Sequence, residues 1–263
     1  MIAPSVSARV KLEEFPLALL VRACPKELSR ATYTAVVGGR SLSLSMSGAP
    51  GRLPTGGNMA RLLALVLTYQ KGAMDDRAME FESSQLIRLM GQSLSGDLYG
   101  RIEAALSVWT DTAYVFESKD AAGSDKPYRA SFRILDSCAQ MPDKRWRIQW
   151  SDPVWLALLQ GAWSGLDAQV LLKLKPLSRQ LYCFLSSRFR TTASLLSIDL
   201  HELCFEHIGI FRSVPTRRLF EMVRKACADL EAAKVLKPRE RRVEKRSKGE
   251  WNVVFENPVF STG

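Results

Sequence analysis

The 263-residue sequence has only two histidines and five cysteines. Both low counts limit the disulfides and metal sites that the protein can form. The cysteines are widely spaced and form no C-x-x-C pair, which predicts reduced, mostly buried thiols in a cytosolic protein. Both histidines lie in HELCFEH (residues 201–207), where their spacing of six does not match the spacing of four in H-E-x-x-H zinc sites. We expect capped or surface histidines beside a buried Cys204, with metal binding as the weaker alternative. No metal and no cofactor are therefore predicted.

The sequence also lacks a long apolar run, a phosphate-binding glycine loop and a convergent pair of carboxylates. The longest apolar segments, FPLALLV and LLALVL, are too short to span a bilayer, and no signal peptide is expected. The glycine-rich segment GAPGRLPTGGN (residues 48–58) has no Gly-Lys-Ser/Thr, so it is not a P-loop. The chain is therefore expected not to be an enzyme, and to be cytoplasmic.

Positive charge is abundant and concentrated. The formal net charge is +10, and residues 212–248 hold 13 lysines and arginines against 5 acidic residues. An excess of this size attracts polyanions, of which nucleic acid is the commonest. Its concentration in one segment predicts a local binding surface there.

One order of elements occurs twice along the chain. Apolar spacing and turn residues predict a helix, a strand, two helices separated by a glycine turn, and then strands. In the first copy the helices are residues 58–71, 84–90 and 96–109, and the strands are residues 79–83, 112–118, 128–136 and 145–150. In the second copy the helices are residues 177–190, 199–209 and those after Ser213, with strands at residues 194–198 and on both sides of RERRVEKRSKG.

The helices that follow the two glycine turns share an apolar stripe at a constant offset of 121 residues. Both stripes advance by 4, 3, 1 and 3, the spacing of one buried helix face. The paired positions are Leu98, Ile102, Ala105, Leu106 and Trp109 with Leu219, Val223, Ala226, Cys227 and Leu230.

This order is that of a winged helix, a helix-turn-helix followed by a β-hairpin. The predicted fold is therefore α+β and helix-rich, with tandem winged-helix domains. The predicted parts are an N-terminal arm (residues 1–30, with a short helix at 12–22), a first domain (31–152), a linking helix (153–175) and a second, basic domain (176–263).

The opposite faces of the two matched helices differ in charge. Arg217, Glu221 and Arg224 share one face of the second helix, where guanidinium groups suit base edges in a major groove. Glu221 could accept from cytosine or orient the arginines. Ser213 and Thr216 suit phosphates at the helix start, and the following basic run suits phosphates or a minor groove. The candidate DNA contacts are Arg212, Ser213, Thr216, Arg217, Arg218, Glu221, Arg224, Lys225, Arg239, Arg241, Arg242, Lys245, Arg246 and Lys248.

The first domain offers a smaller candidate set, Ser95, Asp97, Tyr99 and Arg101, on a nearly neutral helix. Four of the six tryptophans lie between Trp146 and Trp163. We favour core packing for these rings, with stacking on single-stranded DNA as the alternative.

Several segments resemble the TrfA-type plasmid replication initiators, over residues 32–236. They are TYT, LIRLMGQSLSGDLYGRIEAALSVW, FRILD, KLKPLSRQLYCFLSSRF and VRKACADLEAAKVL. The resemblance implies two winged-helix domains that bind direct repeats of double-stranded DNA in a plasmid origin. It also implies opening of an adjacent A·T-rich region, recruitment of a host initiator and helicase, and a balance between monomer and homodimer.

The function expected from the sequence is therefore a plasmid replication initiator. A winged-helix transcriptional repressor and a protein-interaction scaffold that never binds DNA are the alternatives. Direct repeats beside an A·T-rich stretch would indicate initiation, and a single palindrome over a promoter would indicate repression.

Overall fold

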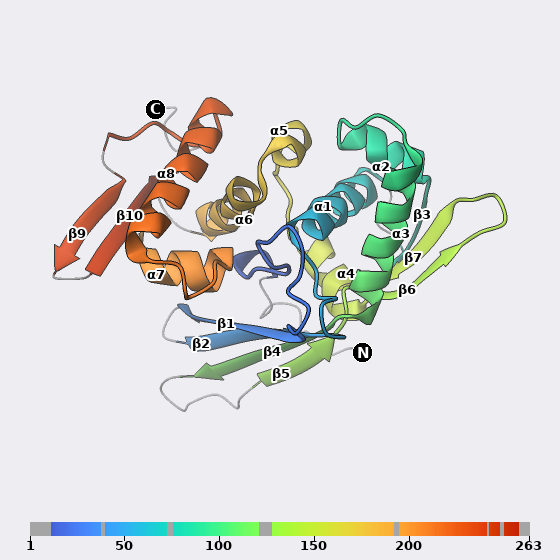
Figure 1. Ribbon diagram of the computed structural model, residues 1–263, viewed down its shortest axis with the longest axis horizontal. Helices are drawn as coiled ribbons and strands as arrows, with labels where there is room; N and C mark the ends of the chain where they lie inside the picture. The colour runs from blue at the N-terminus through green and yellow to red at the C-terminus, as the bar shows by residue number, and fades with distance from the viewer. Residues whose placement is uncertain are drawn as a thin grey trace.

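The computed structural model describes residues 12–37, 40–72, 76–120, 128–191, 195–240, 242–247 and 250–257. It is a mixed fold of helices and antiparallel sheets, as predicted, in which two similar units lie side by side (Figure 1). The first unit has the following order: α1 (Gly56–Lys71), β3 (Ala78–Phe81), α2 (Ser83–Leu89), α3 (Gly96–Asp111), β6 (Leu135–Gln140) and β7 (Trp146–Trp150).

The second unit repeats this order. It consists of α6 (Pro176–Thr191), β8 (Leu195–Asp199), α7 (Leu200–Glu202) continued by the π-helical segment η3 (Leu203–Ile208), α8 (Thr216–Ala232), β9 (Val243–Ser247) and β10 (Glu250–Glu256).

The sheet of each unit has the same strand order. The sheet of the first unit runs β3-β7-β6, and that of the second runs β8-β10-β9. In both, the last strand of the unit lies between the other two. The repeat predicted from the sequence is therefore present in the order of the elements and in their pairing.

An additional sheet of order β1-β2-β4-β5 lies beneath both units in the view of Figure 1. Its strands are β1 (Arg30–Val37), β2 (Arg40–Ser47), β4 (Ala113–Asp120) and β5 (Tyr128–Phe132). The single strand predicted over residues 128–136 is broken, since it ends at Phe132 in β5 and resumes at Leu135 in β6. Strands β4 and β5 join the N-terminal strands, while β6 and β7 form a sheet with β3. Local sequence patterns do not specify which strands pair, so this division was not predictable.

The N-terminal segment is part of the first core. Leu12, Phe15, Leu17 and Leu19 are almost completely buried there. Only Leu12–Glu14 form a short 3-10 helix, η2, so the prediction of a helix over residues 12–22 was wrong. Pro16 explains the early end, because proline has no amide hydrogen to continue a helix.

The predicted linking region also belongs to the first core. It forms α4 (Asp152–Leu159) and α5 (Ala168–Lys173), and both bury leucines among residues of the first unit. A separate core begins at Leu174 and contains the buried faces of α6 and α8. The two cores therefore meet at the end of α5.

Charged and polar groups connect the two units. Glu14, which is fully buried, is paired with Arg188 of α6 at 3.2 Å, and Glu13 is paired with Arg190. The amide of Thr34 in β1 donates to a carboxylate oxygen of Glu206 in η3 at 2.5 Å. These contacts join the N-terminal segment and the additional sheet to the second unit, and so they fix how the second unit sits against the rest of the protein.

The glycine turns before the matched helices form as expected. Gly91 and Gly209 adopt positive φ angles of 68° and 86°, a conformation that glycine tolerates best. Ser95 is the N-cap residue of α3. Ser213 is not the N-cap of α8, because that helix begins at Thr216 after Pro215. Among the described helices, none is both long enough and apolar enough to cross a membrane.

Candidate nucleic-acid interface

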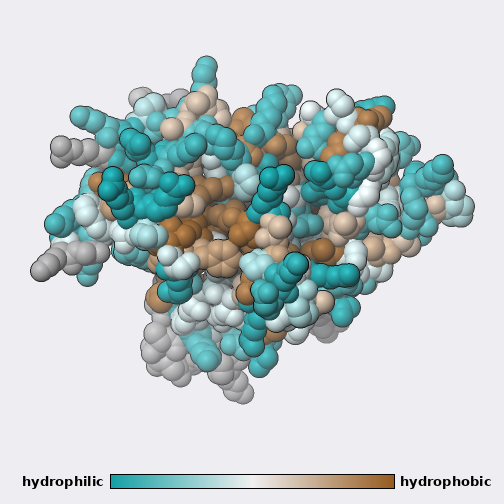
Figure 2. Space-filling model, in the orientation of Figure 1, coloured by the Kyte–Doolittle hydropathy of each residue, from teal (hydrophilic) through white to brown (hydrophobic). Residues whose placement is uncertain are grey.

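Helix α8 is anchored by its apolar face and presents a charged one. All five predicted stripe residues, from Leu219 to Leu230, are buried. The opposite face carries Arg217, Arg218, Arg224 and Lys225, all of them exposed. Figure 2 shows hydrophilic side chains gathered over this helix. The helix therefore holds a rigid row of cations at the surface.

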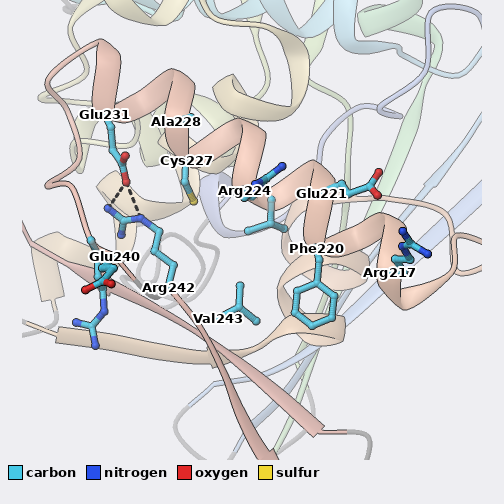
Figure 3. Close-up of a pocket in the computed structure, with 12 residues that line it drawn as sticks. Arg217, Phe220, Glu221, Arg224, Cys227, Ala228, Glu231, Glu240, Arg242 and Val243 are labelled. Atoms are coloured by element: carbon cyan, nitrogen blue, oxygen red, sulfur yellow. Dashed lines mark hydrogen bonds and ion pairs between the residues drawn. The ribbon is translucent and has the colours of Figure 1, made fainter.

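A groove of about 490 Å³ separates α8 from the chain that enters β9. Figure 3 shows the side chains of one helix face on one side of this groove and the β9–β10 hairpin on the other. Phe220, Val223 and Val243 contribute apolar surface, and Arg217, Glu221 and Arg224 belong to the lining. The three residues predicted to share one helix face are thus gathered beside one groove.

Arg217 and Arg224 are available to bind a ligand. Within the described residues, neither has an ion-pair partner in the protein. A guanidinium group in this state keeps its five donors for an external acceptor. Arg217 and Arg224 lie about two helical turns apart, so both can reach base edges in one major groove.

Glu221 has a different role from the one expected beside the arginines. Its carboxylate lies 3.1 Å from the guanidinium of Arg218, its neighbour at i−3. It therefore offsets the charge of Arg218 and leaves Arg217 and Arg224 unneutralised. The two side chains are 68% and 49% exposed, so the pair contributes little to stability.

The start of α8 is held by a histidine. The Nε2 atom of His201 lies 3.0 Å from the hydroxyl of Thr216. Ser213 is exposed in the preceding turn, where Arg212 pairs with Glu206 and lies 5.5 Å from the ring of Phe205. Thr216 is thereby positioned at the helix start, where phosphates are bound in many proteins.

Arg242 corrects the prediction of a wholly exposed basic wing. Only 9% of its surface is accessible. Its guanidinium lies 2.6 Å from Glu231 and also donates to the carbonyl of Lys237, as Figure 3 shows for the glutamate. The predicted exposure of Arg242 was wrong, because its donors are used to attach the hairpin to the end of α8.

The remaining wing cations fall into two groups. Arg239 is half-buried between Glu244 and Glu256, at 3.0 and 2.7 Å, so its charge is offset. Lys245 and Arg246 are exposed on β9. The basic run thus forms a strand rather than only a loop. Two further candidates, Arg241 and Lys248, lie outside the described residues.

The corresponding helix of the first unit presents a different surface. Asp97 and Arg101 form an ion pair at 2.7 Å on α3, which cancels both charges. Ser95 and Tyr99 are exposed nearby. As expected, α3 is the weaker candidate for DNA contact.

The tryptophan cluster and one of the two histidines belong to the interior. Trp146, Trp150 and Trp163 are buried, and the indole of Trp155 donates to Tyr69 at 2.9 Å, so the expectation of core packing is confirmed. His207 is fully buried, which was not expected of a surface histidine. Among the described residues, no group of three potential metal ligands lies close together.

Sequence reasoning missed the two aromatic residues beside the groove. Phe220 of α8 and Trp251 of β10 meet with ring centroids 4.7 Å apart. Phe220 is a large apolar residue that lies outside the buried stripe of α8, and this position could have indicated a contact with another element. Its partner could not be found without the pairing of the hairpin.

Comparison with models of known protein families and with curated proteins gives no match. Solved structures do match. The chain is similar in fold to domains 2 and 3 of RctB. One RctB structure aligns over 92% of this chain and 95% of its own, with a TM-score of 0.61 and 16% identity.

A second structure of RctB domains 2–3 covers 94% of this chain and 96% of its own, with a TM-score of 0.58 and 15% identity. The WH1 domain of the replication protein MSBI1.176 aligns over 40% of this chain and 79% of its own, with 14% identity, but its TM-score of 0.31 carries no argument. At these identities, the likeness to RctB concerns the fold, and it extends over both units.

Proposed function

We propose that this protein is a replication initiator that binds repeated sites in double-stranded DNA. In this proposal both units are winged helices, and the second makes the principal contact through α8 and the β9–β10 hairpin. The observation that carries the proposal is the pair of unneutralised guanidiniums, Arg217 and Arg224, beside the groove between helix and hairpin.

The proposed division of labour follows from which charges remain free. Arg217 and Arg224 read base edges, where a bidentate guanidinium discriminates best at guanine. Thr216, Lys225, Lys245 and Arg246 contact phosphates and set the register. The first unit supports this interface and adds little affinity, because its α3 face is nearly neutral.

Initiation rather than another DNA-binding role is supported by two likenesses. The sequence segments resemble TrfA-type initiators, and the arrangement of both units is similar to RctB domains 2 and 3. The proposal includes opening of an A·T-rich region, recruitment of host replication proteins and a cytoplasmic, plasmid-associated location. It includes no catalytic step.

The first test is selection of duplexes from a random pool by the full chain. Arg217→Ala and Arg224→Ala should each weaken binding to the selected duplex by about 1–3 kcal/mol and affect a random duplex less. Arg101→Ala, an exposed arginine on the matched helix α3, is the control and should change neither. Failure to enrich any sequence, or equal losses on both duplexes, would contradict base reading by α8.

The arrangement of the selected sites separates initiation from repression. Sites that occur as direct repeats beside an A·T-rich stretch near the gene support an initiator. A single palindrome over a promoter would instead identify a repressor with the same interface.

Salt dependence gives a further prediction. In this proposal three free cations contact phosphates, namely Lys225, Lys245 and Arg246, so the slope of log K against log salt should be about −2.7. A titration between 50 and 200 mM salt, roughly the range in which such slopes are measured, checks this value. A slope near zero would contradict a polyanion partner.

A further inference from the structure

The far end of the β9–β10 hairpin has little support from its own sheet. Strand β10 pairs with β8 only from Asn252 onward. Trp251 and Glu250 pair with β9 alone. A two-stranded ribbon is only marginally stable by itself. Something outside the sheet must therefore hold this end if it is to keep one position.

The contact between Phe220 and Trp251 supplies that support. The rings meet edge to face, with centroids 4.7 Å apart and planes at 86°. Phe220 stands one residue before Glu221 and three after Arg217 on α8, and in Figure 3 its ring points from the helix towards the hairpin. The aromatic pair therefore joins the helix that carries the free arginines to the unsupported end of the hairpin.

A β-bulge lies beside this contact. Trp251 is opposite Lys245, and Glu250 is opposite Ser247, so Arg246 is the extra residue in β9. Bulges bend a strand locally and change the direction of a side chain. The Nζ atom of Lys245 also lies 5.9 Å from the centre of the Trp251 ring, within the range of a cation–π interaction. Trp251 is thus next to Lys245 and Arg246, the exposed cations of β9.

We propose that Phe220 and Trp251 are positioning residues for DNA binding. They hold the hairpin against α8 so that Lys245 and Arg246 meet phosphates of the same duplex that Arg217 and Arg224 read. This inference rests on the proposed function. It adds that the aromatic contact places the phosphate-binding hairpin beside the helix that reads the bases. The pair acts through Lys245 and Arg246 and need not touch DNA.

The proposal predicts a change in salt dependence rather than a simple loss of folded protein. Trp251→Ala should remove two phosphate contacts and make the slope of log K against log salt less steep by about 1.8. The defect relative to the unaltered protein should consequently be roughly tenfold larger at about 50 mM than at about 200 mM salt. Trp251→Phe keeps an aromatic ring and should restore most of the slope.

A double substitution tests whether the tryptophan acts through the wing cations. Arg246→Ala alone should reduce the slope by about 0.9. In the Trp251→Ala background, it should have almost no further effect, because that contact has already been lost. Phe220→Leu, which keeps an apolar side chain without a ring, is the second route to the same loss should Trp251→Ala fold poorly.

The measurements use the full chain, one selected duplex and one random duplex, with thermal unfolding of each variant as the folding control. Equal losses at every salt concentration, or full additivity with Arg246→Ala, would overturn the positioning role while leaving DNA binding by α8 intact. Absence of duplex binding by the unaltered protein would instead overturn the proposed function itself.

Discussion

Burial determines what individual cysteine and arginine side chains can do in this protein. Burial raises the pKa of the thiols of Cys183, Cys204 and Cys227 to about 12, because a thiolate is poorly solvated in an apolar core. Cys24 and Cys138 are only half-buried. The same sequence thus contains inert and accessible thiols that its composition does not distinguish.

Thiol labelling should separate these two classes. At about pH 8 the three buried thiols remain protonated and shielded, so a thiol reagent should modify Cys24 and Cys138 first in the native protein. All five cysteines should react in denaturant. Mass spectrometry of the labelled peptides measures this, and early modification of Cys204 or Cys227 would contradict the buried core of the second unit.

The same pKa shifts predict how stability depends on pH. An unfolded thiol loses its proton near pH 8.5, whereas the buried thiols keep theirs to about pH 12. The unfolded state therefore binds fewer protons over this interval, and the free energy of unfolding should fall as pH rises above about 9. Urea unfolding at pH 8, 9 and 10 under reducing conditions checks this, and a rise in stability would show that the thiols are not buried.

Burial also distinguishes two arginines of the second unit. Arg217 and Arg242 both come from the basic segment, but only Arg217 keeps its charge free at the surface. Arg242 pairs with Glu231 in the last turn of α8, 11 residues away in sequence. A charge run therefore identifies a region, while the position of each acidic partner selects the residues that can bind DNA.

At the scale of elements, the two glycine turns have the same backbone form in different surroundings. A Cβ atom at Gly91 would meet nothing within 4 Å, whereas one at Gly209 would lie 2.8 Å from the ring of Pro16. Pro16 belongs to the N-terminal segment of the first unit. The turn before α8 is therefore also a contact between units, unlike the turn before α3.

Matched substitutions can separate these two properties. Gly91→Ala should destabilise by about 1–2 kcal/mol through its positive φ alone. Gly209→Ala should lose about 1–3 kcal/mol more, because the new methyl group also clashes with Pro16. Urea unfolding of both variants measures the two losses in stability. Equal losses would show that Pro16 moves aside without destabilising the protein.

At the scale of the whole molecule, buried charges hold the two units in one arrangement. Glu14 lies fully buried in the first unit and meets Arg188 of α6 at 3.2 Å. A buried ion pair need not add stability relative to apolar residues, but removal of one member leaves an uncompensated charge. The relative position of the units should therefore be sensitive to this pair.

Arg188→Leu should destabilise the protein by about 3–5 kcal/mol. The exposed pair of Asp97 and Arg101 provides the control, and Arg101→Leu should change stability by less than about 1 kcal/mol. Glu14→Gln added to Arg188→Leu should recover part of the loss, because the buried charge is then absent. Equal effects of the two arginine substitutions in thermal unfolding would contradict a buried joint.

The sequence by itself determined the local features of this protein. The five-residue stripe of α8, the glycine turns and the repeated order of helices and strands all follow from short-range spacing, because each depends on neighbours within a few residues. The concentration of positive charge in residues 212–248 was likewise visible without a structure.

Only the tertiary structure decided which strands pair and which charges remain free. β4 and β5 join β1 and β2, Arg242 is taken by Glu231, and Trp251 meets Phe220. Each of these outcomes depends on groups distant in sequence that come together when the chain packs. Short-range periodicity shows which face of a helix or strand is buried. The residues that this face packs against are determined by the packing of the whole chain.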